Sequence, residues 1–175
     1  GCGLLGSSLL RKISKKKLVI KIFIYEKSKS NITQIKKLKL KAIIINKLED
    51  AVIKSDLIIL CTPMSSYKNI ILKMNKFLKP TQVITDVGSS KIETIKVIKK
   101  FLNKKIFWTS SHPIAGSEVS GPRYGKHDLF EDKWCVLIKD KNTNENHISI
   151  LKKFWKKIGS KVVEMSAEKH DKAFS

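Results

Sequence analysis

The chain has 175 residues, of which 42% are hydrophobic and 7% are aromatic, and this composition suits one folded domain rather than a disordered chain. Its formal net charge is +21, but only Arg11 and Arg123 among the 36 basic residues are arginines and the lysines are spread over the whole length, so we expect no nucleic-acid partner. Because the apolar runs are much shorter than the roughly 20 residues that cross a bilayer, we also expect no membrane partner and a cytoplasmic location.

The first six residues, GCGLLG, match the glycine pattern G-x-G-x-x-G, and a helix is predicted from about residue 5. In a dinucleotide-binding loop each glycine has its own role. Gly1 would make the tight turn, Gly3 would let the backbone approach a pyrophosphate, and Gly6 would allow close packing of the helix, whose N-terminus attracts phosphate. The pattern therefore predicts that Gly1, Gly3, Leu4, Leu5 and Gly6 bind a cofactor.

A strand is predicted over residues 18–25, and it ends at Glu26, about 20 positions after Gly6. A dinucleotide fold places there the acid that binds the two ribose hydroxyls. A carboxylate at this position repels a 2′-phosphate and so favours NAD. Lys27 and Lys29 could reach such a phosphate, which leaves NADP possible.

Short β-branched runs and helix-like segments alternate along the rest of the chain. Further strands are predicted over residues 42–45, 57–61, 83–86, 106–109, 134–138 and 161–165, and helices from residue 29 and over residues 65–77, 89–102 and 144–158, with a polar turn at 140–146. This alternation predicts an α/β fold with a doubly wound, mostly parallel sheet of the Rossmann type. The first strand of that fold, which precedes the glycine loop, is missing from the chain, so the strands at 18–25 and 57–61 should have open edges.

Two predicted strands end in residues that suit a ligand site. Thr62 and Pro63 follow residues 57–61, and the segment VGSSK, which contains Ser89, follows residues 83–86. Because ligands bind beyond the carboxyl ends of parallel strands, we expect these residues on the nicotinamide side of a cofactor. Ser89 could also cap the helix that follows it.

Residues 111–121, SHPIAGSEVSG, show neither helical nor strand periodicity and are predicted to form a loop that holds side chains for a ligand. His112 suits a proton acceptor at cytoplasmic pH because a neutral imidazole has a pKa near 6.5. His127 and His147 lie in polar surroundings and are expected to be solvated. The histidines and the three cysteines lack metal-ligand spacing, so we expect no metal site and reduced, buried thiols at Cys2, Cys61 and Cys135.

The chain contains, in this order, the segments GCGLLGS, LCTP, TDVGSSK, SHPIAGSEVSG, DLFEDK and MSAEKHD. The same order is seen in prephenate and arogenate dehydrogenases of tyrosine biosynthesis, which the chain resembles over nearly its whole length. The resemblance implies NAD(P)-dependent oxidative decarboxylation of prephenate to 4-hydroxyphenylpyruvate, or of arogenate to tyrosine. It implies that His112 is catalytic and removes the proton of the substrate's ring hydroxyl. Ser89 would lie between that hydroxyl and the cofactor, and Ser117 and Glu118 would line the substrate pocket.

The resemblance also implies a domain division. Residues 1–167 would form the nucleotide-binding domain, truncated at its N-terminus, and residues 168–175 would begin an all-helical domain that forms a homodimer and supplies an arginine for the substrate carboxylate. The chain alone is then expected to be inactive. His170 would belong to the first helix of that domain and is interpreted as structural.

Two other classes of function remain open at this point. Another Rossmann dehydrogenase, acting on a hydroxy acid or an imine, would share GCGLLG and the TP dipeptide but would leave SHPIAGSE unexplained. A non-catalytic NAD-binding domain or a basic nucleic-acid-binding protein is the alternative of a different class, and the intact Ser89, His112 and Glu118 argue against it.

Overall fold

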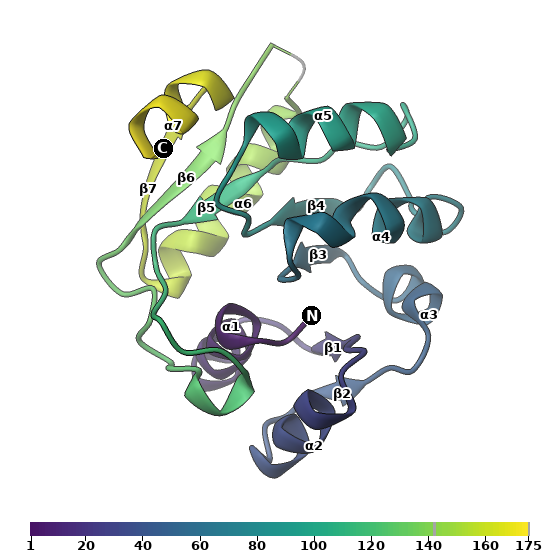
Figure 1. The fold of residues 1–175 in the computed structure, drawn as a ribbon, viewed down its shortest axis with the longest axis vertical. Helices are drawn as coiled ribbons and strands as arrows, with labels where there is room; N and C mark the ends of the chain where they lie inside the picture. Colours follow the sequence, from purple (N-terminus) through teal and green to yellow (C-terminus); the bar gives the residue numbers. More distant parts are fainter. Residues whose placement is uncertain (142, 175) are drawn as a thin grey trace.

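The computed structural model describes residues 1–141 and 143–174 and shows strands and helices in alternation (Figure 1). The strands are β1 (Phe23–Ile24), β2 (Ile43–Ile44), β3 (Leu57–Leu60), β4 (Val83–Asp86), β5 (Ser111–Pro113), β6 (Trp134–Ile138) and β7 (Lys161–Met165). The helices are α1 (Leu4–Lys16), α2 (Lys29–Lys37), α3 (Leu48–Ile53), α4 (Tyr67–Met74), α5 (Ile92–Phe101), α6 (Glu145–Ile158) and α7 (Ala167–Phe174), with 3₁₀ turns at Met64–Ser66 and Pro122–Tyr124. Within the described ranges, no helix has the length and apolar character needed to cross a membrane.

The strand pairs are mostly parallel. β1 pairs with β2, β3 with β4, and β6 with β7 in parallel, whereas β5 runs antiparallel to β6. Alternate residues of β4 face opposite layers, because Val83 packs in a cluster with residues of α1 and α6, and Ile84 packs with residues of α4 and α5. Helices therefore cover both faces, as the doubly wound Rossmann-type prediction requires, and that fold class is confirmed.

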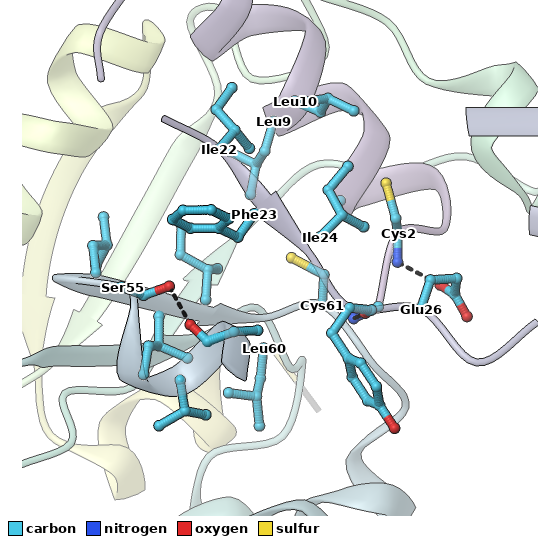
Figure 2. A pocket seen from close by; sticks show the side chains of 18 of the residues that line it. Cys2, Leu9, Leu10, Ile22, Phe23, Ile24, Glu26, Ser55, Leu60 and Cys61 are labelled. Carbon is cyan, nitrogen blue, oxygen red and sulfur yellow. Dashed lines mark hydrogen bonds between the residues drawn. The ribbon is translucent and has the colours of Figure 1, made fainter. Parts of the chain in front are cut away.

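A large apolar cavity separates β1 from β3. Among the described residues, β1 pairs only with β2 and β3 only with β4, so each has an open edge. The cavity between these edges has a volume of about 1090 Å³. Figure 2 shows Leu9 of α1, Ile22 just before β1, Ile24 of β1 and Leu60 of β3 around it. That a further strand belongs in this space stays a prediction.

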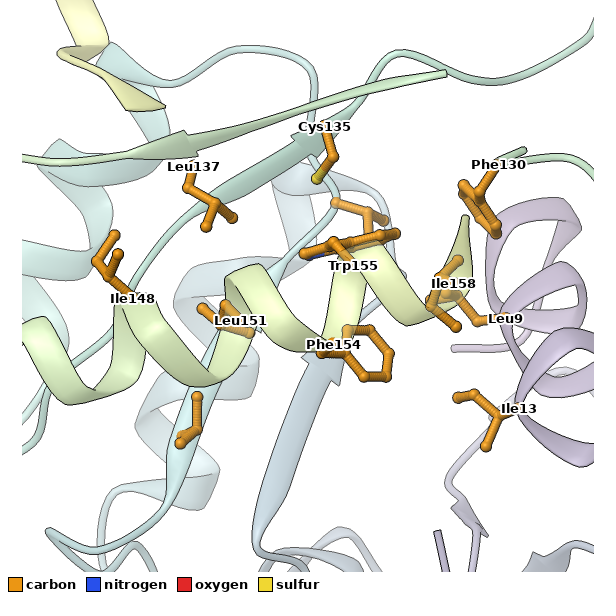
Figure 3. Packing of buried hydrophobic residues seen from close by; sticks show 12 residues of the cluster. Leu9, Ile13, Phe130, Cys135, Leu137, Ile148, Leu151, Phe154, Trp155 and Ile158 are labelled. Atoms are coloured by element: carbon orange, nitrogen blue, oxygen red, sulfur yellow. The ribbon is translucent and has the colours of Figure 1, made fainter. Parts of the chain in front are cut away.

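The main core lies between α6, α1 and β6 (Figure 3). Helix α6 buries Leu151, Trp155 and Ile158, whose spacing of three to four residues places them on one face. The side chain of Asn144 accepts a hydrogen bond from the backbone N–H of His147 and starts this helix, and Gly159, with φ of 107°, ends it in a left-handed conformation. A fully buried tryptophan such as Trp155 contributes about 3–5 kcal/mol relative to alanine.

Three of the predicted elements differ from the structure because pairing partners override the local pattern. Residues 106–109 form no strand; they carry only a single parallel bridge between Trp108 and Ile84. The strand predicted at 18–25 is shorter in the structure, where it is β1. Among the described residues, no strand pairs with the edge of β1 that faces the cavity. The predicted loop at 111–121 instead begins with β5, whose flanks are fixed by hydrogen bonds from Ile138 N–H to the Ser110 oxygen and from Ile114 N–H to the Trp134 oxygen.

The predicted helices are present, but the bounds of two of them differ from the prediction. The helix predicted at 65–77 divides into a 3₁₀ turn and α4, and α5 starts three residues after Ser89, which is therefore not its cap. α3 was not predicted; it has Glu49 and Asp50 in its first turn, where acidic residues favour a helix start. The polar turn at 140–146 closes with a hydrogen bond from Thr143 N–H to the Asp140 oxygen, and residue 142 lies outside the described residues.

Candidate functional site

The glycine loop is packed so closely that two of its glycines cannot carry a side chain. A Cβ atom at Gly1 would lie 2.7 Å from the Thr62 methyl carbon, and one at Gly6 would lie 2.7 Å from the Gly1 oxygen. A Cβ at Gly3 would meet nothing within 4 Å. Gly3 therefore borders open space at the start of α1, where a group from outside the protein could approach the backbone.

The N-terminus of α1 has free hydrogen-bonding capacity. Gly3 is the capping residue and has no side chain to accept from the first amides of the 13-residue helix, which begins with Leu4 and Leu5. Beside this end, the Thr62 hydroxyl is buried without a hydrogen-bond partner among the described residues. A helix N-terminus, an open glycine and an orphaned hydroxyl together fit the phosphates of a dinucleotide.

Glu26 lies against the glycine loop, as Figure 2 shows. Its carboxylate accepts hydrogen bonds from the backbone N–H of Cys2 at 2.7 Å, of Lys27 at 2.8 Å and of Ser28 at 2.9 Å. Burial opposes ionisation of Glu26, but the backbone N–H groups of Ser28 and Cys2 outweigh it and hold the pKa of the carboxyl below its usual value. The acid is thus charged and placed beside the loop that would hold the phosphates.

A buried ion pair organises the end of β4. Asp86 and Lys91 are both fully buried, and the Lys91 ammonium donates to the Asp86 carboxylate at 2.7 Å and to the Ser111 carbonyl at 2.9 Å. The same carboxylate also accepts hydrogen bonds from the Gly88 backbone N–H at 3.0 Å, the Tyr67 hydroxyl at 3.3 Å and the Trp108 indole N–H at 3.1 Å. These contacts tie the loop containing Ser89 to strand β5. Sequence reasoning missed both charged residues of this pair.

His112, in the middle of β5, is half-buried and lies over α7. Its Nδ1 atom is 2.8 Å from Nε2 of His170, whose side chain is fully buried. Burial, followed by the nearby charge of Lys91 and by His170, lowers the pKa of His112 to about 4, against smaller opposing effects of Asp86 and Asp171. His112 is therefore neutral near pH 7 and can accept a proton.

The other predicted site residues lie at the ends of strands but share few contacts. Thr62 and Pro63 follow β3, and Ser89, exposed, follows β4. Ser117 and Glu118 are exposed in the segment after β5, and neither makes a side-chain hydrogen bond within the described ranges. The structure thus joins the glycine loop to Glu26 and Thr62, and joins the end of β4 to the strand that carries His112. Among the described residues, no hydrogen bond joins Ser89 to His112.

Two expectations about other polar residues are decided by burial. His147 is not solvated: it is buried at the start of α6, packs edge-on against Phe107 and has a lowered pKa because of burial. The prediction of free, largely buried thiols is confirmed, since Cys2 and Cys135 are buried and Cys61 is partly so. Burial raises the pKa of Cys2 to about 12 and of Cys61 to about 11, so neither is a thiolate nucleophile near neutral pH.

A glycine turn at a helix N-terminus, an acid beside it at the end of the next strand, and parallel strands covered on both faces define a nucleotide-binding domain of the Rossmann type. The family described as "Prephenate dehydrogenase, nucleotide-binding domain" matches residues 9–164. The chain belongs to this family, which confirms the resemblance seen in its motifs.

Similar proteins agree with this assignment. The cyclohexadienyl dehydrogenase of Zymomonas mobilis is 33% identical over 171 residues, which cover 98% of this chain and 58% of that protein. The prephenate dehydrogenase of Lactococcus lactis is 30% identical over 177 residues, covering 98% and 47%. The prephenate dehydrogenase of Aquifex aeolicus, solved in complex with hydroxyphenyl propionate and NAD+, has a TM-score of 0.90 at 28% identity, covering 99% of this chain and 60% of that one. The chain spans about half to three-fifths of these relatives.

Proposed function

We propose that the protein catalyses the NAD-dependent oxidative decarboxylation of prephenate or arogenate. The observation that carries this proposal is the state of His112, a neutral, half-buried imidazole beside the carboxyl end of β4 with one ring nitrogen already hydrogen-bonded. A relative with the same fold holds NAD+ together with a hydroxyphenyl compound. A proton acceptor next to a nucleotide site suits the oxidation of an alcohol.

The cofactor would lie over the glycine loop. Gly1, Gly3 and Gly6, with Leu4 and Leu5, would form the loop that binds the pyrophosphate, and the Glu26 carboxylate would accept the ribose hydroxyls. Thr62 and Pro63 would border the nicotinamide end. When bound, NAD supplies the acceptor for a hydride. The negative charge of Glu26 favours NAD, while Lys27 and Lys29 leave NADP as a possible second cofactor.

The chain's own residues would orient the substrate and take one proton. The unengaged Nε2 atom of His112 would accept the proton of the ring hydroxyl, and Ser89 would hold that hydroxyl in place. Ser117 and Glu118 would line the pocket. Loss of the hydride and the hydroxyl proton would give a ring ketone, and loss of its carboxylate as carbon dioxide would make the ring aromatic. The resulting phenolate oxygen would then take back one proton, which His112 can return, to give the phenol.

The domain division and assembly belong to the same proposal. Residues 1–167 would be the nucleotide-binding domain, and residues 168–175 would begin a helical domain that forms a homodimer and contributes an arginine to the substrate site. The enzyme would act in the cytoplasm. Support comes from the position of α7, which starts at Ala167, directly after the last strand, β7.

The test is an assay of the natural protein with NAD and a panel containing prephenate, arogenate, hydroxy acids and imines. The proposal expects reduced cofactor and carbon dioxide in equal amounts with prephenate or arogenate. Turnover of a hydroxy acid or an imine, without any turnover of prephenate or arogenate, would overturn the proposal. Salt-dependent retention on DNA, with no turnover of any of these substrates, would instead favour a nucleic-acid-binding protein.

A further inference from the structure

Three side chains form a continuous hydrogen-bonded series from β5 to the start of α5. His112 Nδ1 lies 2.8 Å from His170 Nε2, and His170 Nδ1 lies 2.7 Å from the Asp171 carboxylate. That carboxylate also accepts the backbone N–H groups of Lys91 and Ile92, both at 2.9 Å. The series therefore ends on a carboxylate that is itself anchored to the N-terminus of α5.

The donors and acceptors along the series can be assigned from the carboxylate end. An ionised carboxylate only accepts, so the proton between Asp171 and His170 lies on His170 Nδ1. In a neutral imidazole the other nitrogen is then an acceptor, so His170 Nε2 accepts a hydrogen bond from the Nδ1–H group of His112. His112 must therefore carry its own proton on Nδ1, so its Nε2 is unprotonated and has a lone pair that can accept a proton. Nε2 has no hydrogen-bond partner within residues 1–141 and 143–174.

We infer that His170 and Asp171 are positioning residues for the reaction: they fix the tautomer and the ring orientation of His112 so that Nε2 is the proton acceptor. This inference rests on the proposed function for the identity of the proton that Nε2 takes. The geometry itself is independent of it. Asp171 orients His170, and His170 orients His112, in the way that a buried carboxylate orients a histidine base in other enzymes.

The surroundings of the two rings restrict them further. Phe174 packs against both, with centroid distances of 5.9 Å to His112 and 5.0 Å to His170. Lys91 and Asp86 are the charged groups that reach His112 from the β4 side, and His170 and Asp171 reach it from α7. After proton transfer to Nε2, the Nδ1–H group would still donate to His170. The negative charge of Asp171 would then offset part of the new charge.

The experiment is nitrogen-detected NMR of the histidine rings in the natural protein labelled with ¹⁵N-histidine, near pH 7. His112 should show a protonated Nδ1 and an unprotonated Nε2. His170→Leu removes the acceptor and should let the Nε2-protonated tautomer appear. His170→Gln retains a side-chain acceptor and should keep most of the wild-type tautomer. Lys169→Leu, at the exposed neighbouring position on α7, is the matched control and should change neither ring nitrogen.

Kinetics supply the second readout. Turnover should fall by about 10²-fold in His170→Leu with little change in KM, because a misplaced base affects the reaction more than binding. His170→Gln should recover part of the loss. A wild-type His112 protonated on Nε2, or an unchanged tautomer in a folded His170→Leu variant, would overturn the inference. Absence of activity in the wild-type protein would instead contradict the proposed function and leave the tautomer result to be judged separately.

Discussion

Glu26 of the β1 end accepts a hydrogen bond from the backbone N–H of Cys2 in the glycine loop, at 2.7 Å. This contact joins the two parts of a nucleotide site that are separated by all of α1. Because two further backbone N–H groups hold the same carboxylate, its position is fixed before any ligand arrives. The negative charge beside the glycine loop is therefore held in place by the fold itself.

Cofactor choice follows from this charge. We predict that the natural protein prefers NAD, and that Glu26→Ser raises the relative kcat/KM for NADP by roughly tenfold, or about 1.4 kcal/mol. The physical reason is relief of repulsion on a 2′-phosphate while Lys27 remains nearby. Glu26→Gln is the control, since it removes the charge but keeps a side-chain oxygen for the Cys2 N–H. A native preference for NADP would contradict the role given to Glu26.

Substitution of His112 tests the proton acceptor. His112→Asn keeps a hydrogen-bonding side chain but removes the basic nitrogen, so turnover should fall by roughly 10²–10⁴, the usual contribution of general acid–base catalysis. Cofactor affinity, measured by fluorescence titration with NADH, should change little. His127→Asn, at an exposed position, is the matched control and should leave both quantities unchanged. Full turnover in His112→Asn would remove this histidine from the mechanism.

The pH dependence of the reaction should reflect the lowered pKa of His112. Because that pKa is about 4 in the folded protein, the acidic limb of the kcat/KM profile should lie near pH 4 rather than near 6.5. The same shift affects folding: the unfolded state binds more protons between these values. The contribution of His112 to stability is therefore complete above about pH 6.5 and is lost as the pH falls toward 4. An acidic limb near pH 6.5 that disappears in His112→Asn would show that the pKa of His112 is not lowered.

The buried Asp86–Lys91 pair should contribute much more to stability than an exposed pair on α5. Lys91→Met leaves a buried carboxylate without its cation and should lower the free energy of unfolding by about 3–5 kcal/mol in urea titrations. Lys96→Met breaks the exposed pair with Glu93 and should cost less than about 1 kcal/mol. Equal effects of the two substitutions would contradict the importance given to the buried pair.

The cavity between β1 and β3 leads to a prediction about folding. We propose that a further apolar strand fills this space, so residues 1–175 expressed alone should bind NAD poorly, turn over no substrate and melt without a sharp transition. A short apolar strand fused ahead of Gly1 should restore cooperative melting and some NAD binding, and a glycine–serine extension of equal length should not. Calorimetry of the three proteins makes the comparison. A soluble monomer of residues 1–175 that melts cooperatively would contradict the proposal.

The parts of the fold that sequence predicted well are those with strong local signals. β4, β6 and β7 match their predicted bounds because each is a short β-branched run between turns. The glycine loop and Glu26 were found because their spacing has a direct physical meaning. β5 was missed because its residues, Ser-His-Pro, have no strand periodicity, and only pairing with β6 makes them a strand.

The missed parts of the site depend on tertiary contacts. Lys91 is one lysine in a lysine-rich chain, and nothing local shows that it is fully buried beside Asp86. His170 was interpreted as structural, yet it contacts His112 across 58 positions of sequence. The signal for the adjacent Asp171 is the His-Asp dipeptide itself, because a carboxylate next to a histidine in sequence can orient its ring.

The proposed reaction removes a hydride and a proton from one carbinol group of the substrate, with His112 as the proton acceptor. The most direct measurement uses prephenate and arogenate that carry deuterium on the ring carbon bearing the hydroxyl, with NAD and the natural protein. One deuterium should appear in each reduced nicotinamide for each carbon dioxide released, and both products should decrease together in His112→Asn. Reduced nicotinamide without deuterium, or release of carbon dioxide without cofactor reduction, would contradict it.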